Sequence, residues 1–230
     1  FTVRFCDKSP SATAVTTSDL ADATVTFTLT GLGARTAWSY ELDEDSIITI
    51  ATLARAELAK SWAYSEEQAL LDGDTTGTHQ DSDVTASTDV RKLFKGYRKH
   101  CIANSYTTSI SAFTIESFTG MIKSMGVYGV RSKDLVWFVS PSVRAQLLTL
   151  KDANNYPVLY GQAAIGPVPA SATMSDVPSI QGIPVVTVEA FRQDLNAAGV
   201  YDGTTTTKTG VILANREGFG YAYTTQAPVL

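Results

Sequence analysis

The stretch SIITIATLARAELAKSWAYSEEQALLDG, residues 46–73, decides how the rest of the chain is interpreted. Its apolar and small side chains recur every three or four positions, which is the period of one helix face. We therefore predict a single long helix from Ser46 to Leu71. Its predicted apolar face consists of Ile47, Ile50, Ala51, Ala54, Leu58, Trp62, Ser65 and Ala69.

Both ends of this helix carry local signals. Asp43, Asp45 and Ser46 offer capping oxygens before the first turn, and Gly73 stands where a left-handed stop residue is expected. At 1.5 Å per residue the helix is about 39 Å long. The average helix of a globular protein has only about a dozen residues, so this helix is unusually long. Such a helix needs a partner along its whole length. That partner is either the rest of the same domain or a neighbouring chain.

The composition is that of an ordinary soluble protein. Of the 230 residues, 44% are hydrophobic and 18% are charged, and the formal net charge is −5. No apolar run reaches the length of about eighteen residues that a membrane-spanning helix needs. Cys6 and Cys101 are expected to be free thiols in a reducing compartment. The start at Phe1, without an initiator methionine, suggests a processed or truncated chain.

Charge is distributed unevenly along the sequence. Residues 1–90 carry 15 acidic and 5 basic side chains, whereas residues 91–160 carry 3 acidic and 10 basic ones. An acidic front and a basic middle could pair head to tail between copies, and added salt would then weaken their association. A solvated surface of mixed charge is an equally good interpretation.

Residues 1–45 are predicted to be extended. Val25, Phe27 and Leu29 alternate with threonines, a pattern typical of a half-buried strand. A small, polar segment precedes them, like the tip of an exposed loop. Together these features predict a projecting two-stranded arm, which needs another surface to pack on.

The rest of the chain mixes helix and strand patterns. Ser140 and Pro141 match the preferred residues of an N-cap and a first helical position. Residues 161–179 are small and proline-rich, which is typical of a surface excursion. The fold class is therefore α+β, with the strands in one central sheet. The predicted helices cover residues 89–103, 114–125 and 142–152, and the predicted strands cover residues 135–139, 183–188, 211–214 and 219–224.

The loop after the long helix partly matches a calcium-binding pattern. Asp72, Asp74 and Asp83 stand at relative positions one, three and twelve, and are weak candidates for metal ligands. Thr76 replaces the usual carboxylate or amide, and Asp83 replaces the bidentate glutamate. A polar turn is the favoured interpretation.

No other motif predicts catalysis. His79 and His100 have no second ligand at metal-binding spacing, and no Gly-x-Ser-x-Gly elbow is present. Glu66 and Glu67 are adjacent carboxylates, but neighbours on a helix point about 100° apart. We therefore expect no catalytic residue and no cofactor, and we predict that the protein is not an enzyme.

A basic cluster follows the polar loop. Its members are Arg91, Lys92, Lys95, Arg98 and Lys99. Five positive side chains in nine residues could bind nucleic-acid phosphate without sequence preference. They could equally face an acidic neighbouring surface, or simply be solvated.

Three blocks, read in order, resemble the major capsid proteins of tailed bacteriophages, whose fold is shared with encapsulins. The first contains SYELDEDS (39–46), the long helix and EEQALLDGDTTG (66–77). The second is VWFVSPSVRAQLLTLKDANNYPVLYG (136–161), and the third is IQGIPVVTV (180–188). In the family's first block a second glycine stands where this chain has Thr75.

This resemblance implies an E-loop over residues 1–45, possibly incomplete in this chain. It also implies a peripheral domain over 46–111, with the long helix as its spine, and an axial domain over 112–230 whose central sheet is flanked by helices. An N-terminal arm and C-terminal peripheral strands are expected to be absent. Some relatives form a covalent crosslink through a lysine of the E-loop. Lys8 is the only lysine before residue 46, and we do not assign that role to it. The residues expected to serve assembly or structure are Glu41, Asp43, Asp45, Trp62, Glu66, Glu67, Gly73, Asp74, Arg91, Lys92, Lys95, Arg98, Lys99, Pro141, Lys151, Asp152, Gly182 and Pro184.

The function implied by the resemblance is structural. The chain would assemble with itself into pentamers and hexamers of an icosahedral shell around double-stranded DNA, in the host cytoplasm and then the virion. Scaffold, portal and decoration proteins are the other expected partners, and no membrane is expected. The alternatives are an encapsulin-type shell around a cargo protein and, more distantly, a calcium-binding or hydrolytic domain.

Overall fold

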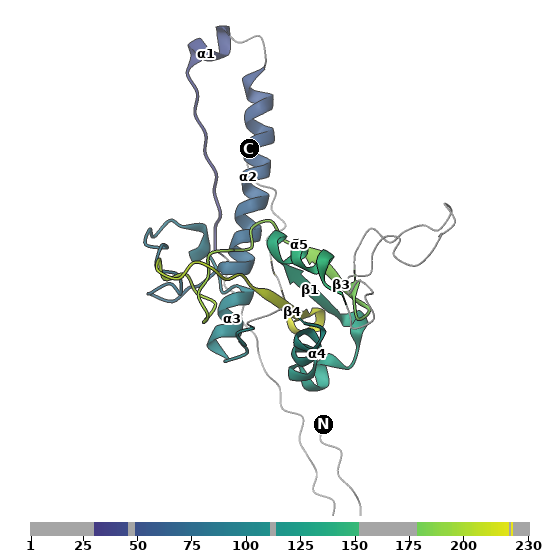
Figure 1. The fold of residues 1–230 in the computed structure, drawn as a ribbon. Helices are drawn as coiled ribbons and strands as arrows, with labels where there is room; N and C mark the ends of the chain where they lie inside the picture. The colour runs from purple at the N-terminus through teal and green to yellow at the C-terminus, as the bar shows by residue number, and fades with distance from the viewer. Residues whose placement is uncertain (1–29, 46–48, 111–113, 152–178, 221, 223–230) are drawn as a thin grey trace, which may run out of the picture. The chain divides into compact units, whose positions relative to one another are not determined.

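The helices and strands form an α+β fold (Figure 1). The computed structural model describes residues 30–45, 49–110, 114–151, 179–220 and 222. All of these except Ala222 belong to one compact unit, Thr30–Tyr221. In chain order the elements are α1 (Tyr40–Asp45), α2 (Ile50–Asp72), η1 (Val90–Lys92), α3 (Tyr97–Ala103), α4 (Ile115–Ser124), η2 (Gly126–Gly129), η3 (Ser132–Asp134), β1 (Leu135–Val139), α5 (Pro141–Thr149), β2 (Ser179–Ile180), β3 (Ile183–Thr187), β4 (Val211–Asn215) and η4 (Arg216–Gly218).

The predicted long helix is present as α2, which ends at Asp72, one residue beyond the predicted end. Its N-cap is Thr49, which makes no side-chain capping bond, so the predicted caps at Asp43 and Asp45 are wrong. Those two residues belong to the separate helix α1, so the prediction of an extended chain fails over residues 40–45. The physical reason is local, because the Ser39 hydroxyl accepts a hydrogen bond from the Leu42 N–H at 3.3 Å.

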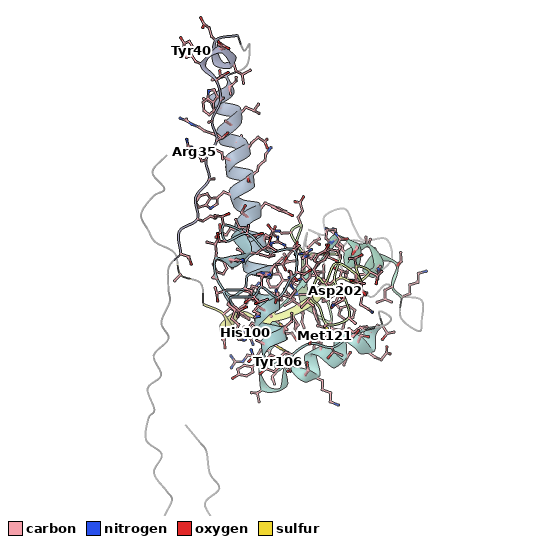
Figure 2. The ribbon with its side chains drawn as sticks, turned by 90° about the vertical axis from the view of Figure 1, so that its left-hand side faces the viewer. Arg35, Tyr40, His100, Tyr106, Met121 and Asp202 are labelled. Atoms are coloured by element: carbon pink, nitrogen blue, oxygen red, sulfur yellow. The ribbon has the colours of Figure 1, made fainter. Side chains whose placement is uncertain are left out.

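The predicted face of α2 is correct over the described residues, which exclude Ile47, but it is only partly covered. Ile50, Ala51, Ala54, Leu58, Trp62 and Ser65 are half-buried, while the residues between them are exposed. No residue of α2 before Ala69 is buried. Packing within the chain is therefore complete only near the C-terminal end. Figure 2 shows Tyr40 near the N-terminal end of α2 and Arg35 beside the middle of the helix, both far from His100 on α3.

Gly73 ends α2 in a conformation that differs from the prediction. Its φ of −59° and ψ of 137° are not left-handed. The glycine is needed for close packing instead, because a Cβ at Gly73 would collide with the carbonyl oxygens of Phe94 and Ala69. Gly96 passes directly beside it and caps α3, which divides the predicted helix 89–103 into η1 and α3.

The sheet has the strand order β2-β3-β1-β4. Strand β1 pairs in parallel with β3 and antiparallel with β4. Strands β2 and β3 form a hairpin whose turn residues, Gln181 and Gly182, have φ values of 53° and 76°, as a two-residue hairpin turn of this kind requires. The strand predicted over 219–224 is not found at Phe219, Gly220 or Ala222, and its other residues lie outside the described ones.

One face of the sheet carries the main core. Trp137 and Phe118 meet edge to face at 5.2 Å between ring centroids, within a cluster built from β1, β3, α4 and α5. Ser140 caps α5 through the Val143 N–H, with Pro141 in its first turn as predicted, although the helix ends at Thr149 rather than residue 152. Helix α4 matches its predicted span closely and is capped by Thr114.

A second, smaller cluster covers part of the opposite face. Leu71 at the end of α2 packs there with Val188, Phe191 and Ile212. This cluster brings the end of the long helix against the sheet. Among the described residues, none of the helices is long and apolar enough to span a membrane.

Candidate functional site

A network of buried ion pairs lies where α2 and α3 meet the segment that follows β3. Arg98 on α3 is at its centre, with its Nε 3.2 Å from Asp72 Oδ1 and its Nη2 bonded to Asp81 Oδ2. Arg192 approaches the same Asp81 oxygen at 3.5 Å, and the Tyr201 N–H donates to Asp81 Oδ1 at 2.9 Å. Asp81 therefore joins chain segments that are more than a hundred residues apart in the sequence.

Further carboxylates, among them Asp89 beside Arg91, pair with basic side chains around this centre. Lys99 lies 2.8 Å from Asp74, and Arg91 and Arg192 each lie 2.9 Å from Asp83. Asp194 pairs with Arg192 at 2.8 Å. The Arg192 guanidinium also stacks over the Tyr201 ring, 4.3 Å from its centroid. Each basic side chain of the network thus contacts at least one carboxylate.

Burial and hydrogen bonding shift the pKa values of two carboxyl groups in opposite directions. Asp72 is 1% exposed, and burial raises its pKa to about 6 despite the opposing charge of Arg98. Burial acts in the same direction on Asp74. However, hydrogen bonds from Lys99, Thr76 and Gln80 outweigh it and lower the Asp74 pKa to about 2. Of these two carboxyl groups, Asp72 is therefore the one whose pKa lies nearer neutral pH.

Several buried polar atoms of the network have no hydrogen-bond partner among the described residues. They are Asp72 Oδ2, Arg98 Nη1 and His79 Nε2. His79 accepts the Asp81 N–H through Nδ1 at 3.0 Å, so its neutral form carries the proton on the unpartnered Nε2. An incompletely satisfied polar cluster is costly to bury, which makes its stability sensitive to small changes of charge.

The calcium-like pattern does not assemble into a ligand set. Asp72, Asp74 and Asp83 face Arg98, Lys99 and the Arg91–Arg192 pair respectively. Among the residues that the structure describes, no group of three or more histidine, cysteine or acidic side chains could hold a metal ion. The carboxylates instead neutralise neighbouring cations.

The basic cluster is not one continuous surface. Arg91, Arg98 and Lys99 pair with acidic residues of the same chain, and Lys92 donates to the Thr85 carbonyl oxygen at 3.2 Å. Only Lys95 is exposed. Much of the predicted attraction between the acidic front and the basic middle therefore acts within the chain.

The other predicted residues are spread over the fold rather than gathered at one site. Asp152 lies outside the described residues. Asp43 and Asp45 are in α1. The remaining positions are exposed Glu41 in α1, half-buried Trp62, Glu66 and Glu67 in α2, exposed Lys151 after α5, Gly182 in the β2–β3 turn and half-buried Pro184 in β3.

Sequence reasoning missed Asp81 and Arg192, the two residues that connect the distant segments. Their local sequences contain no motif. The one available signal is that Arg192 is among only three basic residues after position 160, and it lies four residues after the predicted strand 183–188.

Comparison with known proteins gives the network its context. The model of a protein family described as the phage capsid family matches residues 9–206. The chain belongs to the phage capsid family. No curated protein matches it significantly. The predicted resemblance is thus confirmed at the level of the family, and the α+β class agrees with it.

Membership in the phage capsid family indicates a structural role for the protein. A phage capsid protein is a structural component of the virion capsid and assembles with itself into a shell. In this member of the family, the ion pairs tie the end of α2 to the segment after β3.

Proposed function

We propose that this protein is a major capsid protein whose pentamers and hexamers tile an icosahedral shell around double-stranded DNA. In this proposal residues 1–45 are the E-loop, residues 46–111 the peripheral domain with α2 as its spine, and residues 112–230 the axial domain. Scaffold, portal and decoration proteins join the shell during assembly in the host cytoplasm. The protein's contribution is geometric rather than catalytic.

The observation that carries this proposal is the half-buried stripe on α2. At 1.5 Å per residue its 23 residues extend over about 35 Å. Within the single chain, the face from Ile50 to Ser65 is only partly covered. Completing the burial of this face by neighbouring copies would contribute roughly 25 cal/mol for each Å² of apolar surface. Repeated contacts of one surface with a different surface of the next copy close into rings when the rotation between copies closes.

Electron microscopy of the purified chain at increasing concentration tests the proposal. Uniform closed particles are the expected result, and a stable monomer at high concentration would overturn it. The content of the particles distinguishes a capsid from an encapsulin-type compartment. Nuclease-protected double-stranded DNA in particles from a complete phage system supports the capsid, whereas a captured cargo protein in place of DNA supports the compartment.

A further inference from the structure

The turn after α4 holds large apolar side chains in water. Val127, Tyr128 and Val130 are 85%, 72% and 77% exposed. Single exposed apolar residues are common on protein surfaces, but three within four positions form a patch of the kind that marks an interaction site. We call residues 126–130 the apolar turn.

The apolar turn is held firmly by the rest of the fold. The Asn215 side-chain amide donates to the Tyr128 carbonyl oxygen at 3.0 Å. Gly126 adopts a φ of +57°, and a Cβ at Gly129 would lie 2.7 Å from the Ile122 carbonyl oxygen. The exposure of the three side chains is therefore built into the backbone.

An apolar hollow lies beside this turn, on the sheet face opposite the main core. Its volume is about 350 Å³. Val186 and Phe219 in its wall are each 41% exposed, and Tyr97 packs against Phe219 with 4.2 Å between ring centroids. The residues that line the hollow are Tyr97, Val136, Phe138, Val186, Ala214, Asn215, Arg216 and Phe219.

Asn215 connects the two features, since it holds the apolar turn and also lines the hollow. The Tyr128 side chain nevertheless remains 72% exposed, so it does not fill the hollow of its own chain. One molecule thus carries an apolar projection and an apolar recess side by side, each without a partner in the described residues.

We propose that the apolar turn of one copy inserts Val127 and Tyr128 into the hollow of the next copy. The inference rests on the proposed function, and a second copy is the chosen partner because a capsid protein assembles with itself. The ring of Tyr128 suits the apolar wall, while its hydroxyl can meet Arg216 at the rim. Because projection and recess are different surfaces, each contact joins unlike surfaces of two copies.

Two variants of the full chain test this contact by sedimentation velocity. The turn variant combines Val127→Ser with Tyr128→Ala, and the hollow variant is Val186→Lys. All three positions are exposed in the single chain, so both variants should melt like the wild type. Each should raise the concentration needed for self-association by about tenfold or more. Phe219→Ala provides a second hollow variant if Val186→Lys fails to fold.

A mixture of the two variants makes the test specific. The turn variant keeps an intact hollow and the hollow variant keeps an intact turn, so mixing them should restore one contact and give one-to-one pairs. Tyr106→Ala, which removes a tyrosine that is 75% exposed elsewhere, should associate like the wild type. Association of the turn variant at wild-type concentrations would overturn the inference. Normal association of the hollow variants would also overturn the inference, because the turns would then contact each other rather than the hollow. A wild-type chain that never self-associates would instead overturn the proposed function.

Discussion

Gly73 and Gly96 meet backbone to backbone at the end of the long helix. The Gly96 N–H donates to the Gly73 carbonyl oxygen at 2.8 Å, and a Cβ on Gly96 would lie 2.7 Å from both Gly73 N and the Leu70 carbonyl oxygen. This crossing brings α3, and with it Arg98, against the last turn of α2.

Gly96→Ala should therefore destabilise the fold by about 3 kcal/mol, since the colliding atoms belong to backbone that cannot move aside cheaply. Chemical denaturation gives the free energy of unfolding. Gly77→Ala is the matched control, because nothing lies within 4 Å of a Cβ there and its effect should be small. Equal unfolding free energies for the two variants would show that the crossing tolerates a methyl group.

Asp72→Asn should change how stability depends on pH. The folded-state pKa of Asp72, about 6, lies above the value of about 3.9 for an unfolded aspartate. Protonation of this carboxyl therefore favours the folded state. The resulting stability is fully present below about pH 4 and is lost as pH rises through 6.

Asparagine removes this proton uptake and keeps an oxygen for the Arg98 Nε. Relative to the wild type, the variant should gain up to about 3 kcal/mol of unfolding free energy between pH 4 and pH 7. Thermal melts at both pH values measure the difference. If Asp72→Asn changed the stability by the same amount at pH 4 and pH 7, that result would contradict a raised Asp72 pKa.

Asp74→Asn should act in the opposite sense. Because hydrogen bonds from Lys99, Thr76 and Gln80 lower the Asp74 pKa to about 2, its ionised form stabilises the fold. That contribution is present above about pH 4 and is lost as pH falls toward 2. The variant should be less stable than the wild type by about 1–3 kcal/mol at pH 7 and should approach it in acid. Melting curves from pH 2 to pH 7 provide the measurement, and a deficit that persists unchanged at pH 2 would argue against the ionised group.

The sequence predicted those features that depend on neighbouring residues. Ser140 and Pro141 mark the start of α5 because capping is a local interaction, and the stripe from Ile50 to Ser65 follows from helical geometry alone. The contact between Asp81 and Arg192 joins residues 111 positions apart, and no local pattern encodes it. The same is true of the crossing at Gly96, where a missing side chain leaves no periodic signal.

Trp62 offers the most direct test of how the long helix is used. It lies on the half-buried stripe of α2, ahead of the buried residues that begin at Ala69. Trp62→Asp should leave the core clusters around Trp137 and Leu71 intact, because neither includes this residue. Near-ultraviolet circular dichroism should then report a folded monomer, while electron microscopy should find no closed particles.

Tyr64→Asp is the control for this change. Tyr64 is 46% exposed and lies about 200° around the helix from Trp62, on the opposite face. If the stripe is the surface that neighbouring copies cover, the Tyr64 variant should still form particles. Particles from the Trp62 variant would show that the stripe stays uncovered in the shell. An unfolded Trp62 variant would show instead that the stripe serves the single chain. Either result would remove the observation on which the assembly proposal rests.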